Sequence, residues 1–579
     1  MSKGLSSAAG SVCQFDSYEL DRASLELRKA GRKLKLAPQP ARVLGLLASR
    51  AGELVTRDEI RREIWGEQTF VDFERGLNYC VNSIRAVLGD DAQSPQYIET
   101  LPRRGYRFIA PVETVPSPSA GSTVLPSIAV LPFTNLSADQ GNVYFSDGLA
   151  DEIITALTRV QGLRVTSRTS SFVFRDQKSD VREIGAKLGV STVLEGSVQR
   201  YSGRIRVSAQ LVSATDGFHL WSEHYDCKVA DIFSIEDEIS QAIARALAVR
   251  LAPARTVRPT SNLEAYNYWL KARHHQHYED LAALPKCRAC LDQAIALDPH
   301  FPQPYLGLAD LFLGMVNFGL ICPRYALAQG RAAISKAIEL DDSVAEIYAL
   351  SGAYRALLDF DWSGASADFD RALDLTPASE QSHRMRAVYY LVPTGRLLEA
   401  EQEMEQAVES DPLSPLAYIE LVKVLLWERQ FDRARARMET AFELWPEYAL
   451  AKWFVGVTFY FQGRIEEALA LWRPALQKIG NSPSLIGPIA MALGQLGHVS
   501  EARQMLAEME AAQDEVYVPA LSRAQVHVGL GENDAALQLL DRAVEEREPH
   551  ILELPFKPIW DGLRKDPRFA RLLRKMRLT

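Results

Sequence analysis

The chain has 579 residues, of which 47% are hydrophobic and 24% are charged, and its formal net charge is −9. This length and composition are typical of a soluble protein with several globular domains, and the negative charge excludes nucleic-acid binding over the whole surface. Six cysteines in so long a chain exclude a disulfide framework and indicate a reducing compartment.

The charge is spread unevenly along the chain. Residues 1–113 hold 17 Lys and Arg against 15 Asp and Glu, a net of +2, whereas residues 114–579 hold 48 against 59, a net of −11. A basic surface in the first part can therefore still attract nucleic acid. Residues 1–12 lack a long apolar core, and no stretch reaches about 18 apolar residues, so we expect a cytoplasmic protein without a membrane span.

Short alternating segments open the chain and predict strands. They are Tyr18–Asp21, Ser24–Leu27 and Lys33–Leu36. A helical pattern follows over Gln39–Arg50. Thr56 and Glu59 then have the spacing of a capping box, in which each side chain satisfies a free backbone N–H of the first turn. This pair predicts a second helix, which ends near Trp65 and Gly66.

A third helix is predicted over Val71–Leu88, with Asp72 as its N-cap. One face is apolar and the other is polar. The apolar face holds Leu77, Val81, Ile84 and Leu88, widened by Cys80. The polar face holds Arg75, Asn78, Asn82 and Arg85, whose guanidinium and amide groups suit phosphate oxygens and base edges. The alternative is an ordinary amphipathic helix with a solvated polar face.

A basic β-hairpin is predicted after this helix. Tyr97–Leu101 and Tyr106–Phe108 alternate as strands do, and Arg103-Arg104-Gly105 forms the turn, where glycine permits positive φ. Two neighbouring arginines at an exposed tip repel each other, and a phosphate backbone would remove that penalty.

The order of these elements resembles the OmpR-like winged helix-turn-helix family, the DNA-binding module of many bacterial response regulators. The resemblance covers about residues 13–112 and predicts an α+β winged-helix domain over residues 1–113. It is carried by Glu19-Leu20-Asp21, Gly52-Glu53-Leu54-Val55-Thr56-Arg57, Ile64-Trp65-Gly66, Ile84-Arg85, Leu88-Gly89-Asp90 and Arg104-Gly105-Tyr106-Arg107-Phe108.

The resemblance implies that the third helix enters the major groove of double-stranded promoter DNA. The side chains that would read bases are Arg75, Asn78, Tyr79, Asn82 and Ser83. Many relatives carry Arg or Lys at the positions of Asn82 and Ser83, so the base preference should differ here.

The same resemblance implies contacts to the DNA backbone and to proteins. Arg85 would touch phosphate, and the hairpin would lie along a minor groove through Arg103, Arg104 and Arg107. The loop Gly66–Val71 would meet RNA polymerase, and two copies would sit on adjacent half-sites as a homodimer on DNA.

A Pro- and Ser-rich linker is predicted at residues 114–126, followed by a second domain at residues 127–251. Its pattern of strands and helices predicts an α/β domain with a mixed sheet. The expected strands are Ile128–Phe133, Leu163–Ser167, Phe172–Phe174, Thr192–Val198, Ile205–Leu211 and His219–Tyr225. The expected helices are Gly148–Val160 capped by Asp147, Val181–Leu188, and Ile232–Leu251.

This second domain resembles the TolB amino-terminal-like domain, which does not imply an enzyme. The resemblance is carried by Leu131-Pro132-Phe133, Ser146-Asp147-Gly148-Leu149, Leu194-Glu195-Gly196-Ser197-Val198 and Leu220-Trp221. The sequence has no phosphate-binding loop, zinc-protease motif or nucleophile elbow, so we expect no catalytic residues and no cofactor. Asp147, Asp151 and Glu152 are expected to stabilise a helix start.

The last part of the chain, residues 262–579, is repetitive. Ala337, Ala372, Ala407, Ala441 and Ala475 are spaced by 35, 35, 34 and 34 residues, and Met509 and Ala543 continue the step. Ala294 precedes Ala337 by 43, so an insertion is predicted around Asn317–Arg324. A period of about 34 with two helices per step is the tetratricopeptide signature, and it predicts an all-α solenoid with a C-terminal capping region. Such arrays bind a protein or peptide partner in a concave groove.

One rival site needs weighing. His274, His275 and His277 precede the pair Cys287 and Cys290, and such a set could hold zinc or act as a redox switch. However, Cys287 occupies the small-residue position of a predicted repeat helix, so packing explains it, and we expect no metal site.

Two functions are compatible with the sequence. In the first, residues 1–113 bind a promoter and the repeats sense a protein partner, which makes the chain a sequence-specific transcriptional regulator. In the second, the chain is an interaction scaffold of the cyclase-associated type, whose DNA module has lost its function. No motif supports a third possibility, an enzyme.

Overall fold

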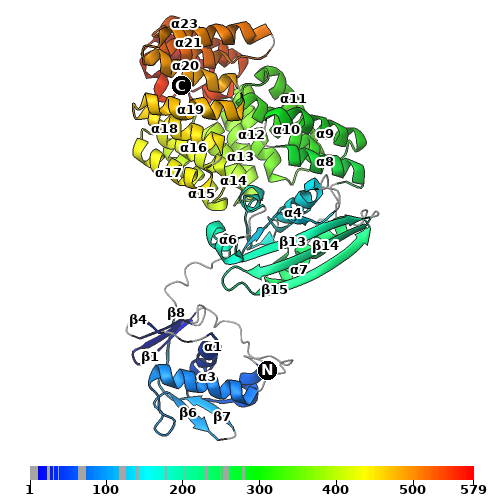
Figure 1. Ribbon diagram of the computed structural model, residues 1–579, viewed down its shortest axis with the longest axis vertical. Helices are drawn as coiled ribbons and strands as arrows, with labels where there is room; N and C mark the ends of the chain where they lie inside the picture. Colours follow the sequence, from blue (N-terminus) through cyan, green and yellow to red (C-terminus); the bar gives the residue numbers. More distant parts are fainter. Residues whose placement is uncertain are drawn as a thin grey trace. The chain divides into compact units, whose positions relative to one another are not determined.

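The computed structural model describes two compact units, Met1–Val124 and Leu125–Thr579, and each is considered by itself (Figure 1). The described residues are 11–21, 26–29, 32–34, 36, 38–62, 73–102, 104–116, 126–137, 143–158, 160–175, 179–201, 204–228, 232–247, 250–251, 260–276, 281–446, 448–480, 482–514 and 516–578. Within them, no helix is both long and apolar enough to cross a bilayer.

The described residues of the first unit form two antiparallel sheets and three helices. One sheet has the order β4-β3-β2-β1-β8, and the other has the order β5-β7-β6. The strands of the first sheet are β1 (Ser11–Phe15), β2 (Tyr18–Asp21), β3 (Glu26–Lys29), β4 (Arg32–Leu34) and β8 (Glu113–Pro116). Those of the second are β5 (Leu54–Thr56), β6 (Ile98–Leu101) and β7 (Gly105–Phe108). The helices are α1 (Pro38–Ser49), α2 (Arg57–Ile60) and α3 (Phe73–Leu88).

Aromatic side chains fill the core of this unit and join its two sheets. The ring of Phe15 packs edge-on against that of Phe108, with centroids 5.0 Å apart, and the Tyr18 hydroxyl donates a hydrogen bond to the Leu88 carbonyl at 2.9 Å. The predicted apolar face of α3 is confirmed, because all its members are buried in this core. They are Leu77, Cys80, Val81, Ile84 and Leu88. The predicted winged-helix fold of this unit is confirmed as well.

Local signals at the start of α2 are also confirmed. The Thr56 side chain accepts from the Glu59 backbone N–H, and Glu59 accepts from that of Thr56. The predicted end of this helix at Trp65 and Gly66, and the predicted cap Asp72, lie outside the described residues. Glu113–Pro116, predicted to start or border a linker, instead form β8, which pairs with β1.

The second unit begins with an α/β domain, and the predicted mixed sheet is confirmed. Its strand order is β12-β9-β13-β14-β15, with β10 beside β13, and β9 runs parallel to both of its neighbours. The strands are β9 (Ser127–Val130), β10 (Thr134–Asn135), β12 (Arg164–Val165), β13 (Thr192–Tyr201), β14 (Arg204–Ser213) and β15 (His219–Lys228). A separate pair joins β11 (Val160–Gln161) to β16 (Arg250–Leu251). The helices are α4 (Val143–Thr158), α5 (Arg168–Phe172), α6 (Val181–Leu188) and α7 (Ile232–Ala246).

Three local predictions in this domain are wrong. Asp147 does not cap a helix, because α4 already begins at Val143 and places Asp147 in its buried interior. Phe172 ends α5 rather than opening a strand, since the Ser167 side chain caps that helix by accepting from the Ser170 N–H. The helix predicted to reach Leu251 stops at Ala246, and β16 pairs with β11 instead.

Paired antiparallel helices make up the rest of the unit and stack through the upper part of Figure 1. The first helices of the pairs are α8 (Leu263–His275), α10 (Pro302–Asn317), α12 (Ala345–Asp359), α14 (Glu380–Arg386), α16 (Pro415–Trp427), α18 (Ala449–Phe461), α20 (Pro483–Gln495) and α22 (Ala520–Gly529). The second helices are α9 (Leu284–Leu297), α11 (Pro323–Leu340), α13 (Trp362–Leu375), α15 (Leu397–Ser410), α17 (Phe431–Leu444), α19 (Ile465–Ile479), α21 (Val499–Ala511) and α23 (Asn533–Glu546). Short helices Pro549–Glu553 and Pro558–Leu563 and α24 (Pro567–Lys575) follow.

The predicted repeat spacing is confirmed. Ala294, Ala337, Ala372 and their successors all lie in second helices and are buried, as a close helix pair requires. The solenoid and the α/β domain pack together into one unit, with α4 against α8. The predicted limits of the linker and the domains remain predictions.

Candidate nucleic-acid interface

Helix α3 presents polar side chains on the side opposite its buried face. Asn78 and Asn82 are exposed, Ser83 is half-buried, and the Tyr79 side chain is 65% exposed. The helical period produces this separation, because positions three and four apart share a face. The exposed row offers two amides, a phenol and a hydroxyl, which are groups that can hydrogen-bond base edges.

The hairpin β6–β7 holds this row through Tyr106. The Tyr106 hydroxyl donates to Asn78 Oδ1 at 3.2 Å and accepts from Arg57 Nη2 at 3.2 Å. The Arg57 guanidinium also lies 5.3 Å from the centre of the Tyr106 ring. Three elements, the start of α2, the hairpin and α3, therefore meet at one hydroxyl. The sequence reasoning missed Arg57 and gave Tyr106 no role of its own.

Arg85 turns inward rather than outward. Its side chain is 11% exposed, and its Nη2 donates to the Ile98 carbonyl at 2.8 Å and to the Thr100 hydroxyl at 2.9 Å. Its Nε lies 3.8 Å from the Asp90 carboxylate, which also accepts the backbone N–H of Ile98. These contacts hold the C-terminal end of α3 against β6, so they favour a structural role over the predicted phosphate contact.

Strand β5 lies close against the hairpin at Gly105. A Cβ at position 105 would stand 2.1 Å from the Val55 carbonyl oxygen, so Gly105 is required by close approach. Next to it, Arg104 is exposed, and its carbonyl accepts the Arg57 N–H. Arg107 pairs across the hairpin with Glu99 at 3.4 Å. Arg104 therefore points a guanidinium to solvent at the tip, whereas Arg107 lies along its side.

Several predicted contact groups cannot be placed. Arg75 belongs to α3, but its side chain lies outside the described residues, as do Arg103 and the loop Gly66–Val71. Of the predicted set, the structure therefore brings Asn78, Tyr79, Asn82, Ser83 and Arg104 to the surface of one unit.

The His and Cys side chains of the rival zinc site lie in separate packing contacts. His274 Nδ1 lies 3.2 Å from the Asp147 carboxylate in the contact between α4 and α8, while Cys287 is buried in α9. Burial raises the pKa of the Cys287 thiol to about 12, the opposite of a reactive thiolate. Among the described residues, which omit His277, no group of three His, Cys, Asp or Glu side chains could hold a metal.

Three family models match separate parts of the chain. The model described as "Transcriptional regulatory protein, C terminal" matches residues 31–108, which include α3 and the hairpin. That described as "HilA/YgeH-like transcriptional regulator, second domain" matches residues 124–244, and a tetratricopeptide repeat model matches residues 419–483. The predicted OmpR-like and tetratricopeptide parts are thereby confirmed, and the TolB-like resemblance of the middle domain stays a prediction.

Curated relatives match different lengths of the chain. Transcriptional regulator HilA of Salmonella typhimurium is 24% identical over 72% of this chain and 74% of its own length. The cholera toxin transcriptional activator of Vibrio cholerae is 39% identical over 14% of this chain and 28% of its own. A putative adenylate cyclase 3 of Rhizobium meliloti is 38% identical, but the match spans only 32% of this chain and 33% of that protein.

Among solved structures, the RstA DNA-binding domain of Klebsiella pneumoniae in complex with the RstA box is 25% identical. That match covers 17% of this chain and 96% of the domain, with a TM-score of 0.16.

Proposed function

We propose that this chain, a transcriptional regulator with an OmpR-like DNA-binding domain and tetratricopeptide repeats, reads promoter DNA with the exposed face of α3. The observation that carries the proposal is the division of α3 into a fully buried apolar face and an exposed row of amide, phenol and hydroxyl groups. A helix of this kind fits the major groove of B-DNA, where each base pair shows a distinct pattern of donors and acceptors.

Asn78 is the best-positioned reading residue. Because Tyr106 donates to its Oδ1, the amide orientation is fixed and the Nδ2 group is left to donate to a base. Asn82 lies one turn further along the exposed row and would read a neighbouring base pair. Tyr79 and Ser83 flank the two amides and would complete the contact.

The hairpin supplies the sequence-independent part of the affinity. Arg104 at the tip, with Arg103 and Arg107, would neutralise phosphates along the minor groove. Arg75 would add a contact at the start of α3. We assign Arg85 to the support of the helix rather than to the DNA, because its donors are engaged with β6.

The repeat array would receive a protein partner and relay its presence to the DNA-binding unit. On this proposal the regulator works in the cytoplasm without a membrane anchor and without catalysis. RNA polymerase contact through Gly66–Val71 and a homodimer on adjacent half-sites belong to the same proposal. Family analogy supports both of them.

Electrophoretic mobility shift of promoter fragments by the full chain and by residues 1–124 tests this function. A regulator retains particular fragments, and retention falls as salt rises because bound counterions are released. Genome-wide mapping of occupied sites then identifies the promoters.

The partial match to a putative adenylate cyclase favours one second candidate, an interaction scaffold with an inactive DNA module. That candidate requires that neither the full chain nor residues 1–124 retain any promoter fragment better than an unrelated duplex.

A further inference from the structure

The end of α10 and the turn after it, where the insertion in the repeat spacing is predicted, contact two later segments of the solenoid. Phe318 follows α10 directly, and its carbonyl accepts a hydrogen bond at 2.7 Å from the hydroxyl of Ser482, at the start of α20. The Asn317 carbonyl lies 3.2 Å from Nε2 of His550, in the short helix Pro549–Glu553. An early pair of helices is thus joined to two segments more than 160 residues later in the sequence.

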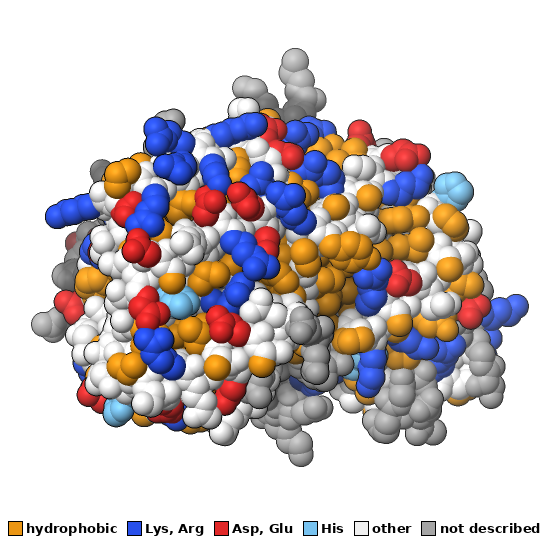
Figure 2. Space-filling model, turned by 90° about the horizontal axis from the view of Figure 1, so that it is seen from above, with side chains coloured by type: hydrophobic (Ala, Val, Ile, Leu, Met, Phe, Trp, Pro, Cys, Tyr) orange, Lys and Arg blue, Asp and Glu red, His pale blue; other side chains and the backbone are white. Residues whose placement is uncertain are grey.

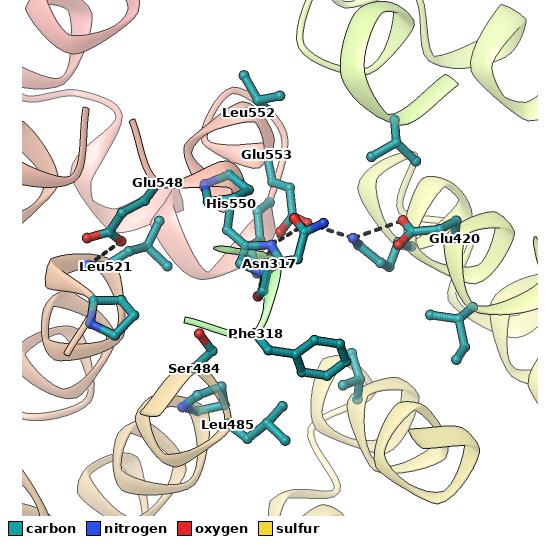
Figure 3. A pocket seen from close by; sticks show the side chains of 18 of the residues that line it. Asn317, Phe318, Glu420, Ser484, Leu485, Leu521, Glu548, His550, Leu552 and Glu553 are labelled. Carbon is teal, nitrogen blue, oxygen red and sulfur yellow. Dashed lines mark hydrogen bonds and ion pairs between the residues drawn. The ribbon is translucent and has the colours of Figure 1, made fainter. Parts of the chain in front are cut away.

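The C-terminal short helices also contact α16 and the residues that follow it. Lys423 of α16 lies 2.8 Å from the Glu553 carboxylate, and Arg429 lies 2.8 Å from that of Asp561. Figure 3 shows the result: Glu420 of α16, Leu485 of α20, Glu553 of the short helix Pro549–Glu553 and Phe318 of the turn after α10 lie around one space. The inner face of the repeats, predicted to be a concave groove, is in this chain the wall of a cavity.

This cavity has a volume of about 370 Å³ and a mostly apolar wall. Aromatic side chains form much of it. They are Phe318, Tyr389, Trp427, Trp453, Phe454, Tyr460, Phe461, Trp472 and Tyr517. Hydrophobic side chains also gather toward the middle of the face seen from above, with many charged ones around them (Figure 2). Ligand sites for small molecules are typically concave, apolar and about 300–1,000 Å³ in volume.

The cationic side chains of the described wall are already paired with carboxylates, and the Glu548 carboxylate is held by hydrogen bonds. Lys423 lies 2.9 Å from Glu420 as well as 2.8 Å from Glu553, and Arg384 lies 2.7 Å from Glu380. Lys557 shares Glu553, and the Glu548 carboxylate accepts the N–H groups of Ala520 and Leu521. An anionic ligand would lose its water without gaining a free counter-charge, and that loss is costly.

We propose that this cavity binds a neutral, largely apolar small molecule. An extended peptide fits the wall poorly, because its N–H and C=O groups need partners that an aromatic surface does not provide. Bound between Phe318, Leu485 and Leu521, the ligand contacts the segments that close the ring, so its binding stabilises the closed solenoid. This ligand site is separate from α3 and from the hairpin, and its existence does not depend on DNA binding.

A pair of fluorescent probes that differ only by charge tests the proposal on the full chain. N-phenyl-1-naphthylamine is neutral, and 8-anilinonaphthalene-1-sulfonate carries a sulfonate on the same skeleton. We expect one neutral probe per chain, bound at least about tenfold more tightly than the sulfonate, which finds no unpaired cation in the wall. The neutral probe should also raise the melting temperature.

Two cavity-filling variants and a matched control locate the site. Val457→Trp and Leu485→Trp enlarge side chains of the wall, and Val499→Trp makes the first change at a position that is 43% exposed outside it. The wall variants that remain folded by circular dichroism should bind the neutral probe at least about tenfold more weakly, and the control should bind it as the wild type does. The proposal is overturned if the wild type binds no neutral probe, if the sulfonate binds equally well, or if a folded wall variant binds like the control.

Discussion

The Tyr106 hydroxyl donates a hydrogen bond to Asn78 Oδ1 at 3.2 Å, and this bond joins the hairpin to the exposed face of α3. The same hydroxyl accepts from Arg57, so the three side chains form a short chain of hydrogen bonds behind the proposed reading surface. These hydrogen bonds fix which end of the Asn78 amide can face a base.

Removing the Tyr106 hydroxyl, and with it the bonds to Asn78 and from Arg57, should weaken DNA recognition by a small amount. Tyr106→Phe keeps the ring in the core and leaves Asn78 free to rotate, so we expect affinity for the preferred promoter to fall by about 0.5–1.5 kcal/mol. Asn78→Ala removes the reading group itself and should also change the preference among sequences. Binding of both variants to a panel of single-base-pair substitutions distinguishes them. Identical losses on every duplex would show that Asn78 reads no base.

Arg85 and Arg104 should separate stability from DNA affinity. Arg85→Ala removes donors to the Ile98 carbonyl and to Thr100, so we expect residues 1–124 to lose about 1.5–3 kcal/mol of unfolding free energy.

Arg104→Ala changes an exposed side chain and should leave stability within about 0.5 kcal/mol. It should lower the slope of log affinity against log salt by about 0.9, the value of one phosphate contact. If Arg85→Ala kept full stability but lowered the slope of log affinity against log salt, the predicted phosphate contact of Arg85 would be supported instead.

Periodic features of the fold could be predicted from the sequence. The apolar spacing of Leu77, Val81 and Ile84 indicates the buried face of α3, and the alanine spacing indicates the second helix of each repeat. Both patterns depend on local geometry that repeats along the chain. The exposure of Asn78 and Asn82 follows from the same period.

Features that depend on distant partners could not be predicted. Asp147 has the sequence signature of a helix cap, yet it lies inside α4, where Arg175 and His274 approach its carboxylate. His274 is more than 120 residues away along the chain, so no local pattern contains that pairing. Arg85 is similar, because only the folded hairpin supplies the carbonyl and hydroxyl that hold it.

The contact between the α/β domain and the repeats should depend on pH through Asp411. Its buried carboxylate receives the hydroxyls of Ser167 and Ser170, and burial together with the charge of Glu380 raises its pKa to about 6. The usual pKa of about 3.9 applies in the unfolded chain, so the folded chain binds more protons between about pH 4 and pH 6. The stability from this group is therefore full below about pH 4 and lost as the pH rises through about 6.

Asp411→Asn should remove that dependence and raise the melting temperature at pH 8. The measurement compares melting temperatures of the wild type and the variant at pH 5 and pH 8. Asp341→Asn is the matched control, because Asp341 follows α11 as Asp411 follows α15. A wild-type profile retained by Asp411→Asn would assign the pH dependence to another group.

The ion pair between Lys423 and Glu553 should hold the repeat ring closed. Burial opposes ionisation of Glu553, but Lys423, Lys557 and His550 outweigh it, and the pKa of Glu553 lies well below its usual range. Its stabilising contribution is therefore present above about pH 4 and is lost only in stronger acid.

Glu553→Gln removes one of the two carboxylates that pair with buried Lys423, and Glu420 remains, so we expect it to lower stability at pH 7 by about 1.5–3 kcal/mol. Urea unfolding of the full chain measures this change. Lys423→Met, alone and combined with Glu553→Gln, completes a double-mutant cycle that isolates the coupling between these two side chains, because Glu420 and Lys557 keep their charges in every variant. Equal stability of wild type and Glu553→Gln at pH 7 would show that the pair does not close the ring.

Salt-dependent binding of a promoter duplex by residues 1–124 tests the central claim most directly. This unit has its own core, and it contains all of α3 and the hairpin. We expect tight retention of the cognate duplex at low salt, a linear fall of log affinity with log salt at about 0.9 per phosphate contact, and a weaker complex with a scrambled duplex. Equal, weak binding of both duplexes at every salt concentration would contradict a sequence-reading role for the exposed face of α3.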